Sequence, residues 1–547
     1  MPDNKDKIVI NGINQPTRLQ LPNLDFAVAE TVKNSALYKN ATGVRSELME
    51  KERLLLAEAA GTNGWDTVSI CRVTALNERI RAEKTYPENM KEEMDPVSVE
   101  GDFKPWQVVT GGDGRNVKLN IPMESGTYRG MSIKDAEGID ISGVSVDVYV
   151  KLSYFPMPDP QNAADGSYEL YTDTGTGDDG GSEDPIAAVI ALHTPEGLLD
   201  EINKSILRGL FERWLNKPEN LKRFDTLFST ILINNMGKES KEYAWLRATS
   251  VSYAYTDKST EESSIFGILC MTNKRSHEGL PNQLPAVSLE RDDNAMFLIS
   301  REVFVKYQFI PSLPYVFTDS PDADYEVDQA GTTVTGKNIV LDSVRVGLID
   351  YHPVAESFEV TFDEAYIRTT ARIHTPISPG IDAHTIIMTK QRLVLDENSQ
   401  NEQVMAYEMV GDPIVENSTD IATWIVVTEA ILALIAAVVT GVAGYVAGKL
   451  VALVVGIVVA LVVALVSITI HVIIEKVIAG AATDALPDIA PMVKVAANQV
   501  KWPFAEPDAF VLSEIDYSGS IIFKGSLILQ EGYSVVDGRL VFEAAIA

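Results

Sequence analysis

The sequence predicts an α+β protein in which elongated antiparallel β-sheets surround a long apolar helix. Three observations support this prediction. Apolar and polar residues alternate with a period of two over much of residues 97–410, which is typical of strands with one buried and one wet face. A nearly uncharged stretch with helical spacing follows between Glu429 and Glu475. Strand-like sequence returns after Lys501, so β structure flanks the apolar stretch on both sides.

The clearest alternation runs from Val144 to Leu152, where valines alternate with Ser145, Asp147 and Tyr149. Comparable patterns predict strands at TSVSYAYT, MFLISREVFVKYQF, SFEVTFDEAYIRTT, HTIIMTKQRLVL, YSGSIIFKGSLIL and GRLVFEAAI. Because few helical segments separate these strands, we expect antiparallel pairing rather than βαβ units.

One helix is expected to interrupt the strands. Thr194-Pro195-Glu196 supplies an N-cap residue, a proline at the first helical position and an acidic first turn. Its buried face should contain apolar residues at helical spacing, namely Leu198, Leu199, Ile202, Ile206 and Leu210. The preceding segment DTGTGDDGGSED, at 173–184, departs from the EF-hand calcium loop and is interpreted as a solvated acidic linker.

We expect four regions along the chain. Residues 1–62 form an N-terminal extension with a helical piece near its end, and residues 63–415 form the β-rich region. Residues 416–500 contain the long apolar helix, or a helical hairpin, packed against the sheets. Residues 501–547 supply the C-terminal strands that complete the sheet.

The apolar segment is long enough to cross a bilayer. Nineteen uncharged residues separate Glu429 from Lys449, and 25 more separate Lys449 from Glu475. Each run could span a hydrocarbon core of about 30 Å as a helix. Small residues recur at every fourth position, which is a helical period and not that of a strand. This small-residue row consists of Ala436, Thr440, Gly444, Gly448, Ala452, Gly456, Ala460 and Ala464.

The ends and continuity of this helix leave two alternatives. Residues 418–420 (Ser-Thr-Asp) could cap its start, and Gly480 fits its end. A continuous helix of about 55 residues would be a rod of roughly 80 Å. Alternatively, the glycines at 441, 444 and 448 could divide the segment into a hairpin with Lys449 at its tip.

Three interpretations of the segment remain open. Either the helix is apolar all round because a sheet covers it, or it lines a groove for an acyl chain, or it inserts into a membrane as a hairpin. Its small-residue row favours close packing against another backbone. Trp424 is the single aromatic anchor near an end of the segment, and basic flanks are sparse, which places the membrane interpretation second.

Composition and motifs disfavour other functions. The net charge of −31 argues against nucleic acid, whose phosphates require clustered basic residues. The sequence lacks GxSxG, HExxH, P-loop and Rossmann patterns, so we expect no enzyme activity, no catalytic residues and no cofactor. The glycines of TGGDGRN, at 110–116, are interpreted as a turn. His374, Asp382 and His384 are weighed as metal ligands, but their Pro- and Gly-rich surroundings favour a turn between strands.

The cysteines and the first residues bear on localisation. Cys71 and Cys270 are too few for a disulfide framework and are expected to be reduced, buried thiols. The opening MPDNKDKIVING lacks the apolar core of a secretory signal. We therefore expect synthesis in the cytoplasm, with release by lysis or a dedicated export route.

The heptapeptide GWDTVSI, at 64–70, opens the β-rich region and resembles the forty-seven-kilodalton protein family encoded beside some botulinum-type neurotoxin genes. The segment SYFPMPDP at 153–160, the β-rich middle, the apolar helix and the closing strands around YSGSIIFKGS are similar in order. The resemblance covers residues 63–547 and extends to the related OrfX proteins of the tubular lipid-binding (TULIP) superfamily.

This resemblance implies a TULIP-like fold, with elongated antiparallel sheets rolled around long apolar helices and a groove for lipid. It implies a non-enzymatic accessory role in a toxin gene cluster, with a contribution to insecticidal activity, and it supplies no catalytic residues. The N-terminal extension departs from the family and could dock a partner. A membrane-inserting or pore-forming toxin component that uses residues 421–480, and a structural protein that binds toxin-cluster partners, remain the alternatives.

Overall fold

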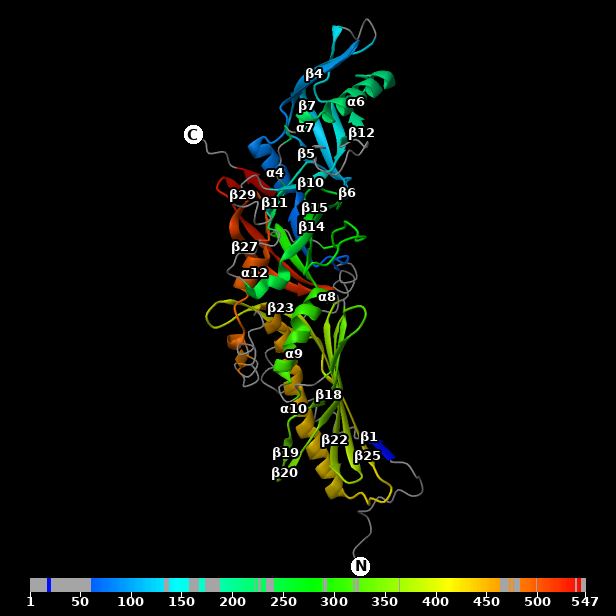
Figure 1. Cartoon of the computed structure of the whole chain (residues 1–547), viewed down its shortest axis with the longest axis vertical. Coiled ribbons are helices and arrows are strands. Elements are labelled where there is room, and N and C mark those ends of the chain that lie inside the picture. Colours follow the sequence, from blue (N-terminus) through cyan, green and yellow to red (C-terminus); the bar gives the residue numbers. More distant parts are fainter. Residues whose placement is uncertain are drawn as a thin grey trace, which may run out of the picture. The chain divides into compact units, whose positions relative to one another are not determined.

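Figure 1 shows the computed structural model of the chain. The residues that it describes are 17–20, 61–131, 137–156, 167–172, 187–221, 223–224, 228–232, 241–287, 289, 293–317, 320, 324–363, 365–462, 472–473, 476, 483–497, 499–536 and 539–542. The chain divides into two compact units, and each unit is built from separate stretches of sequence. Unit 1 falls within residues 1–61, 299–492 and 514–522, and unit 2 within 62–298, 493–513 and 523–547.

Unit 2 consists mainly of sheets. Across the first sheet the strands are β27 (Ala505–Tyr517), β28 (Ser520–Leu529), β16 (Ala295–Ser300), β2 (Thr67–Arg72), β15 (Ile265–Thr272), β14 (Ala248–Thr256) and β6 (Asp113–Gly114). The second contains β12 (Ala187–His193), β9 (Ser145–Val150), β7 (Val117–Arg129), β4 (Val97–Phe103) and β3 (Asn89–Met94), with β5 (Gln107–Val108) and β8 (Ile139–Asp140) paired to β7.

Smaller elements complete this unit. A third sheet contains β10 (Leu152–Pro156), β11 (Ser167–Thr172), β13 (Ser229–Leu232) and β26 (Val500–Lys501), and β29 (Tyr533–Val536) pairs with β30 (Arg539–Phe542). The helices are α4 (Val73–Glu83), α6 (Glu201–Leu215), α7 (Pro218–Leu221) and the 3-10 helix η3 (Lys241–Leu246). α12 (Ala490–Ala497) precedes β26 in the chain.

The period-two prediction is confirmed at β9. Val146, Val148 and Val150 are buried, and β9 pairs antiparallel with β7 on one side and β12 on the other. The intervening Asp147 is also buried, because Lys118 and His193 reach its carboxylate from the two neighbouring strands. Alternation here therefore marks a strand whose second face is closed by an ion-pair cluster.

The helix predicted from Thr194 begins later than expected. α6 starts at Glu201, and its N-cap is Asp200, whose side chain accepts a hydrogen bond from the backbone N–H of Asn203 at 2.8 Å. Residues 194–200 form a turn in which Gly197 has a φ of +75°. Because this backbone conformation cannot continue a right-handed helix, the earlier cap residues start no helix. The predicted buried face is also wrong at Ile202, which is 71% exposed.

Unit 1 contains one large sheet. Across it the strands are β1 (Thr17–Gln20), β25 (Ile414–Ile421), β23 (Ile381–Glu397), β22 (Ile367–Ser378), β21 (Val354–Phe362), β18 (Thr333–Val340) and β17 (Asp324–Val327), with β24 (Gln403–Met409) paired to β23. The predicted strands at SFEVTFDEAYIRTT and HTIIMTKQRLVL form the antiparallel ladder β21–β22–β23. A separate hairpin joins β19 (Val344–Val346) to β20 (Ile349–Tyr351).

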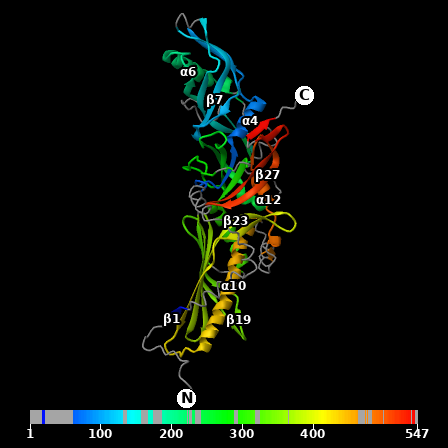
Figure 2. The same ribbon diagram turned by 180° about the vertical axis from the view of Figure 1, so that it is seen from behind.

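The helices of unit 1 lie along one side of this sheet, as Figures 1 and 2 show. They are α8 (Arg301–Phe304), the π-helix η4 (Val305–Phe309), α9 (Ile310–Val316), α10 (Glu429–Val462) and the 3-10 helix η5 (Thr483–Ala485). α10 packs against β22, β23, β24, β19, η4 and α9. The architecture is thus rich in antiparallel strands, with one long apolar helix among the described residues.

The prediction of a strand throughout MFLISREVFVKYQF is wrong. Only its first residues belong to a strand, β16, and the chain then turns into α8 and η4. Ser300 causes the change, because its hydroxyl accepts a hydrogen bond from the backbone N–H of Val303 at 3.3 Å and caps α8. Val303, Phe304 and Phe309 then bury the helical face.

Candidate functional site

The candidate site is the apolar surface of α10 and the elements around it. The helix begins at Glu429, after Thr428, whose hydroxyl accepts a hydrogen bond from the backbone N–H of Ile431 at 3.4 Å. The predicted capping residues 418–420 lie instead in β25, where they pair with β23. They end nine residues before Glu429, which is too far from the first helical turn for their side chains to cap it.

α10 is continuous across the glycines that could have broken it. Gly441, Gly444 and Gly448 lie within the helix, so the hairpin with Lys449 at its tip does not form. Lys449 instead places its Nζ 3.5 Å from the Asp342 carboxylate. Ala464 and Gly480 lie outside the described residues.

Burial changes along α10. In its last turns each described residue from Ala452 to Val462 is buried. In its first half one face is buried, by residues at helical spacing: Ile435, Val438, Val439, Val442, Val446 and Leu450. The opposite side is exposed at Ala430, Ala433, Leu434 and Ala437. α10 is therefore a core helix at its C-terminal end and a surface helix at its N-terminal end.

The small-residue row crosses from the surface into the core. Ala436, Thr440, Gly444 and Gly448 are half-buried, whereas Ala452, Gly456 and Ala460 are buried. In the first half the fully buried face is the neighbouring row of branched aliphatic residues. The N-terminal part of the small-residue row is thus a strip of low side chains that remains partly accessible.

Side chains of neighbouring elements approach this row closely at some glycines and not at others. A Cβ added to Gly456 would lie 3.0 Å from Val316 Cγ2 of α9, and one added to Gly441, beside the row, would lie 3.2 Å from Val344 Cγ1 of β19. At Gly448 an added Cβ would meet no described atom within 4 Å. The row is therefore packed at its C-terminal part and open at Gly448.

The sheet beneath the helix is not wholly apolar. Thr369, Thr389 and Gln391 alternate with outward-facing residues on the buried face of β22 and β23, and the side chains of all three are linked by hydrogen bonds. Gln391 is 2% exposed, and its Oε1 is buried and accepts no hydrogen bond within the described part of the chain. An acceptor in this position can orient a polar group of a ligand.

Trp424 lies outside the helix, in the connection between β25 and α10. Its side chain is 70% exposed. A Cβ added to Gly380, in the β22–β23 turn, would lie 2.9 Å from Trp424 Cζ2, so the indole rests on that turn. Trp424 therefore marks the end of unit 1 where α10 begins.

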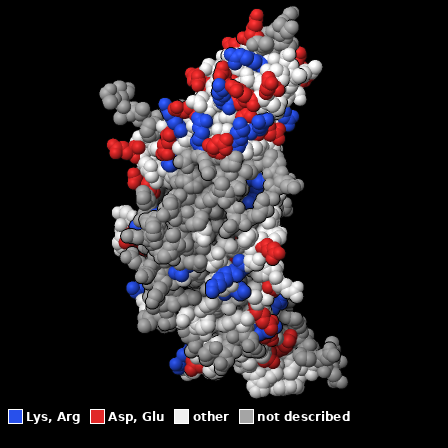
Figure 3. All heavy atoms as spheres, turned by 45° about the horizontal axis from the view of Figure 1, so that its top comes forward, with Lys and Arg blue, Asp and Glu red and all other residues white. Residues whose placement is uncertain are grey.

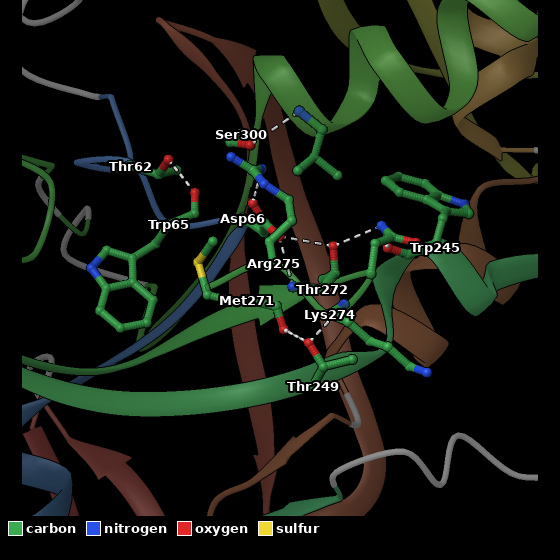
Figure 4. Close-up of polar contacts among 12 residues, drawn as sticks. Thr62, Trp65, Asp66, Trp245, Thr249, Met271, Thr272, Lys274, Arg275 and Ser300 are labelled. Atoms are coloured by element: carbon green, nitrogen blue, oxygen red, sulfur yellow. Dashed lines mark hydrogen bonds and ion pairs between the residues drawn. The ribbon is translucent and has the colours of Figure 1, made fainter. Parts of the chain in front are cut away.

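The segment GWDTVSI forms a polar cluster in unit 2, shown in Figure 4. Asp66 is fully buried, and its carboxylate accepts hydrogen bonds from the backbone N–H of Thr272 at 2.6 Å and from the Thr272 hydroxyl at 3.0 Å. The Arg275 guanidinium contacts the same carboxylate. Trp65 is buried beside it and donates from its indole N–H to the Pro281 carbonyl at 2.8 Å.

This cluster joins β2 to the end of β15 and to the segment that follows. Each of its partners lies some 200 residues away, for example 206 between Asp66 and Thr272. The sequence motif marked the position but gave no sign of these partners. Because Asp66 is fully covered and fully engaged, the cluster stabilises unit 2 and offers no open site.

The two histidines weighed as metal ligands lie side by side in the β22–β23 ladder. The rings of His374 and His384 are stacked with centroids 5.1 Å apart. His374 Nε2 is 3.1 Å from Asp382 Oδ1, and His384 Nε2 is 3.3 Å from Asp420 Oδ2. No three metal-binding side chains gather closely enough to hold an ion in the described residues. As predicted, residues 379–380 form the turn between these strands.

The other predictions from the sequence concern a glycine-rich turn, an acidic linker and two cysteines. Asp113 and Asn116 exchange backbone hydrogen bonds of 3.2 and 3.0 Å, so TGGDGRN is a tight turn. The acidic segment 173–184 lies outside the described residues. Both cysteines are free and buried, as expected.

Charged side chains of both signs are interspersed on the face shown in Figure 3. On β3, β4 and β7, for example, Lys91 Nζ lies 3.0 Å from Glu93 and Arg129 Nη1 lies 3.3 Å from Glu100. Among the described residues such pairs mix the two signs of charge, whereas a surface that follows a phosphate backbone carries a basic stripe.

Comparison with known proteins gives consistent similarities. The family model OrfX-like, described as Protein OrfX2/OrfX3/P47, matches residues 62–525. Protein OrfX3 of Paraclostridium bifermentans is 27% identical over 384 residues, covering 65% of this chain and 77% of that protein. Protein OrfX3 of Clostridium botulinum (strain Kyoto / Type A2) is 28% identical over 396 residues, covering 66% and 78%.

Solved structures with a similar fold include two P47 proteins. P47 from Clostridium botulinum A2 superposes with a TM-score of 0.55 at 14% identity, covering 86% of this chain and 100% of that one. P47 of Clostridium botulinum E1 gives 0.52 at 15% identity, covering 85% and 99%. At this identity the comparison supports the fold alone.

Proposed function

This chain belongs to the OrfX-like family of OrfX2, OrfX3 and P47 proteins, and from that membership we propose that it is a non-enzymatic accessory protein of a toxin gene cluster that binds a lipid or another apolar ligand. The toxin-cluster role is supported by the OrfX3 relatives, which are proteins of botulinum toxin gene clusters. Other products of such a cluster are its natural protein partners.

The lipid-binding part of the proposal depends on one observation. The N-terminal part of the small-residue row is partly accessible, and Gly448 has open space above it among the described residues. A strip of Ala, Thr and Gly side chains beside the buried aliphatic row that contains Ile435, Val439 and Val442 would leave a shallow channel on the helix surface, which suits an extended acyl chain. Each methylene that leaves water there would contribute about 0.8 kcal/mol.

A polar acceptor below the helix supports the same proposal. α10 packs on β23, and Gln391 of that strand keeps a buried Oε1 without a hydrogen bond among the described residues. A hydroxyl or amide of a ligand could donate to it, which would recover the cost of burying that oxygen. We take the sheet of unit 1 and α10 to be the part of the chain that corresponds to a TULIP-like rolled sheet.

The test is lipid analysis of the purified full chain. Native mass spectrometry and solvent extraction should detect lipid in the wild-type protein, and Gly448→Leu should remove most of it by filling the channel. Gly209→Leu is the matched control, because Gly209 is an exposed helical glycine of α6 with no atom within 4 Å of an added Cβ. A lipid-free wild-type protein that also takes up no lipid from vesicles, or undiminished lipid in Gly448→Leu, would refute the proposal.

A second candidate function is insertion of α10 into a membrane as part of a pore. α10 has 34 residues and is the one helix among those described that is long and apolar enough to cross a bilayer. Core helices of soluble proteins meet the same criterion, and 81% of its most apolar window is buried. Dye release from vesicles at neutral and acidic pH separates the two functions, because a lipid carrier leaves the vesicles sealed.

A further inference from the structure

One end of unit 1 exposes large apolar side chains from two separate segments. Leu348 and Ile349, on the β19–β20 hairpin, are 89% and 58% exposed. Trp424, Val426 and Leu434, at the start of α10 and in the connection before it, are 70%, 45% and 37% exposed. We call these five residues the apolar end.

The hairpin points toward the beginning of α10. Asp342, which precedes β19, accepts a hydrogen bond from the Tyr445 hydroxyl at 2.7 Å, and Val344 and Val346 contact the helix at Gly441. The hairpin therefore runs antiparallel to the helix, and its apex extends about 7 Å past Val346 toward the helix N-terminus. Leu434 lies in the same direction, about 10 Å from Gly441 along the axis. Figure 1 shows the hairpin beside this part of α10.

The hairpin turn places a leucine at its apex. Val346 and Ile349 are paired, so Gly347 and Leu348 form a two-residue turn, and Gly347 has a φ of +65°. This conformation at the first position is typical of a type II′ turn, which continues the twist of the strands. The turn is tight and short, and Leu348 projects from it into solvent.

The charged side chains around the apolar end are either paired or acidic. Arg345 lies 3.9 Å from Asp350, and His374 and His384 face Asp382 and Asp420 near the turn on which Trp424 rests. Glu429 is exposed between Val426 and Leu434 and adds a negative charge. This end therefore repels an anionic surface but not a zwitterionic one.

We propose that the apolar end docks on the interface of a zwitterionic phospholipid bilayer. Trp424 takes the position that indoles favour at the boundary between headgroups and acyl chains. Leu348, Ile349 and Leu434 enter the outer acyl region, and the paired charges remain among the headgroups. The docking is shallow and leaves α10 folded, so the bilayer stays sealed.

The shape of the apolar end favours a bilayer over a folded protein partner. Protein interfaces concentrate their energy in side chains that fill pockets within a broad contact area. Here the exposed residues lie at a hairpin apex and a chain connection, and the most exposed of them projects furthest. Projecting apolar tips enter a fluid surface without the need for a matching pocket.

The fluorescence of Trp424 would report contact with a bilayer directly. The chain has six tryptophans, and the other five are at most 7% exposed. Mixing the full chain with phosphatidylcholine vesicles that carry brominated acyl chains should quench the Trp424 emission, while the vesicles retain a trapped dye. Trp424→Phe should still float with vesicles but lose the quenching, which assigns the signal to this residue.

Leu348→Asp should weaken vesicle flotation about tenfold, because a carboxylate replaces a leucine that would leave water. Ile202→Asp is the matched control, since Ile202 is 71% exposed on α6 of unit 2, and it should float like the wild type. Absence of flotation and quenching with the wild-type chain, equal flotation of Leu348→Asp, or binding that requires anionic lipid would overturn the proposal. The lipid content of the purified protein should be unaffected by Leu348→Asp, so this proposal and the lipid-carrier proposal can fail separately.

Discussion

The Arg275 guanidinium contacts the buried Asp66 carboxylate across 209 residues of chain. Arg275 is 38% exposed, whereas Asp66 is fully buried, so the two residues should differ in their response to substitution. Arg275→Ala removes the basic partner of a buried carboxylate and should lower the free energy of unfolding by about 3 kcal/mol. Asp66→Asn keeps an acceptor for Thr272 and should cost less.

Urea unfolding of both variants and of the double variant would measure this difference. The double variant should lose less than the sum of the two single losses, because the second substitution acts on a pair already broken. Additive losses would show that the two side chains are energetically independent.

The start of α6 gives a second prediction. Asp200→Ala should reduce stability by about 1 kcal/mol, since it deletes the side chain that accepts the Asn203 N–H. Thr194→Ala should have little effect, because that residue precedes the turn and caps no helix in the structure. A larger loss in thermal stability for Thr194→Ala than for Asp200→Ala would place the helix start at the earlier residue.

Two glycines of the small-residue row, Gly448 and Gly456, should respond to substitution in opposite directions. Gly448→Ala should raise the free energy of unfolding by about 0.5–1 kcal/mol, because alanine is favoured inside a helix and its methyl has room. Gly456→Leu should lower it by about 1–3 kcal/mol, because Val316 occupies the space that the side chain would need. Urea midpoints of both variants, measured beside the wild type, test the packing directly.

Acid stability should depend on Asp147. Burial alone would raise the pKa of this carboxyl, but hydrogen bonds from Lys118, Asn120 and His193 outweigh it and the pKa is lowered. The folded state then binds the proton less readily than the unfolded chain, in which the pKa of an aspartate is about 3.9. The stabilisation is present above that value and is lost as the pH falls through the folded-state pKa.

Asp147→Asn should therefore flatten the decline of stability at acidic pH. The measurement is the urea midpoint of variant and wild type at several pH values on both sides of 3.9. Glu201→Gln, at a carboxylate whose side chain is 88% exposed, is the control and should leave the profile unchanged. Parallel profiles for Asp147→Asn and wild type would contradict the assignment.

Both thiols should be unreactive in the native protein. Burial raises the pKa of Cys71 well above its ordinary value, and burial together with the nearby Asp66 charge raises the pKa of Cys270 to about 12, despite a hydrogen bond from Thr67. Little thiolate is then present at pH 8, and alkylation requires thiolate. Iodoacetamide should label neither cysteine until urea is added, and rapid native labelling would show that unit 2 opens at β2 or β15.

Local patterns were sufficient for the strands that have one wet face. In the ladder β21–β22–β23 buried residues alternate with more exposed ones as the sequence does, because water on one side keeps polar residues in alternate positions. The pattern failed after β16, because that strand is buried on both faces and the alternating segment VKYQF, at 305–309, lies in the helix η4. Periodicity cannot separate strand from helix in such a run.

The candidate site was predictable in part. The period of four identified α10 as a helix, but the face that it buries depends on β19 and α9, which lie far away in the sequence. The apolar end required both the hairpin and the helix start, and no local signal connects Leu348 with Trp424. The Asp66 cluster was marked only by its motif, because its partners follow some 200 residues later.

The division of both units into separate stretches has a consequence for synthesis on the ribosome. β2 is among the first described strands to emerge, yet in its sheet it lies next to β16, and β16 lies next to β28, which is made almost last. At about 5–20 residues per second, the early strands of unit 2 wait many seconds for these neighbours. A holdase that shields β2 and β15 during translation would therefore raise the yield of folded protein more than one that acts after release.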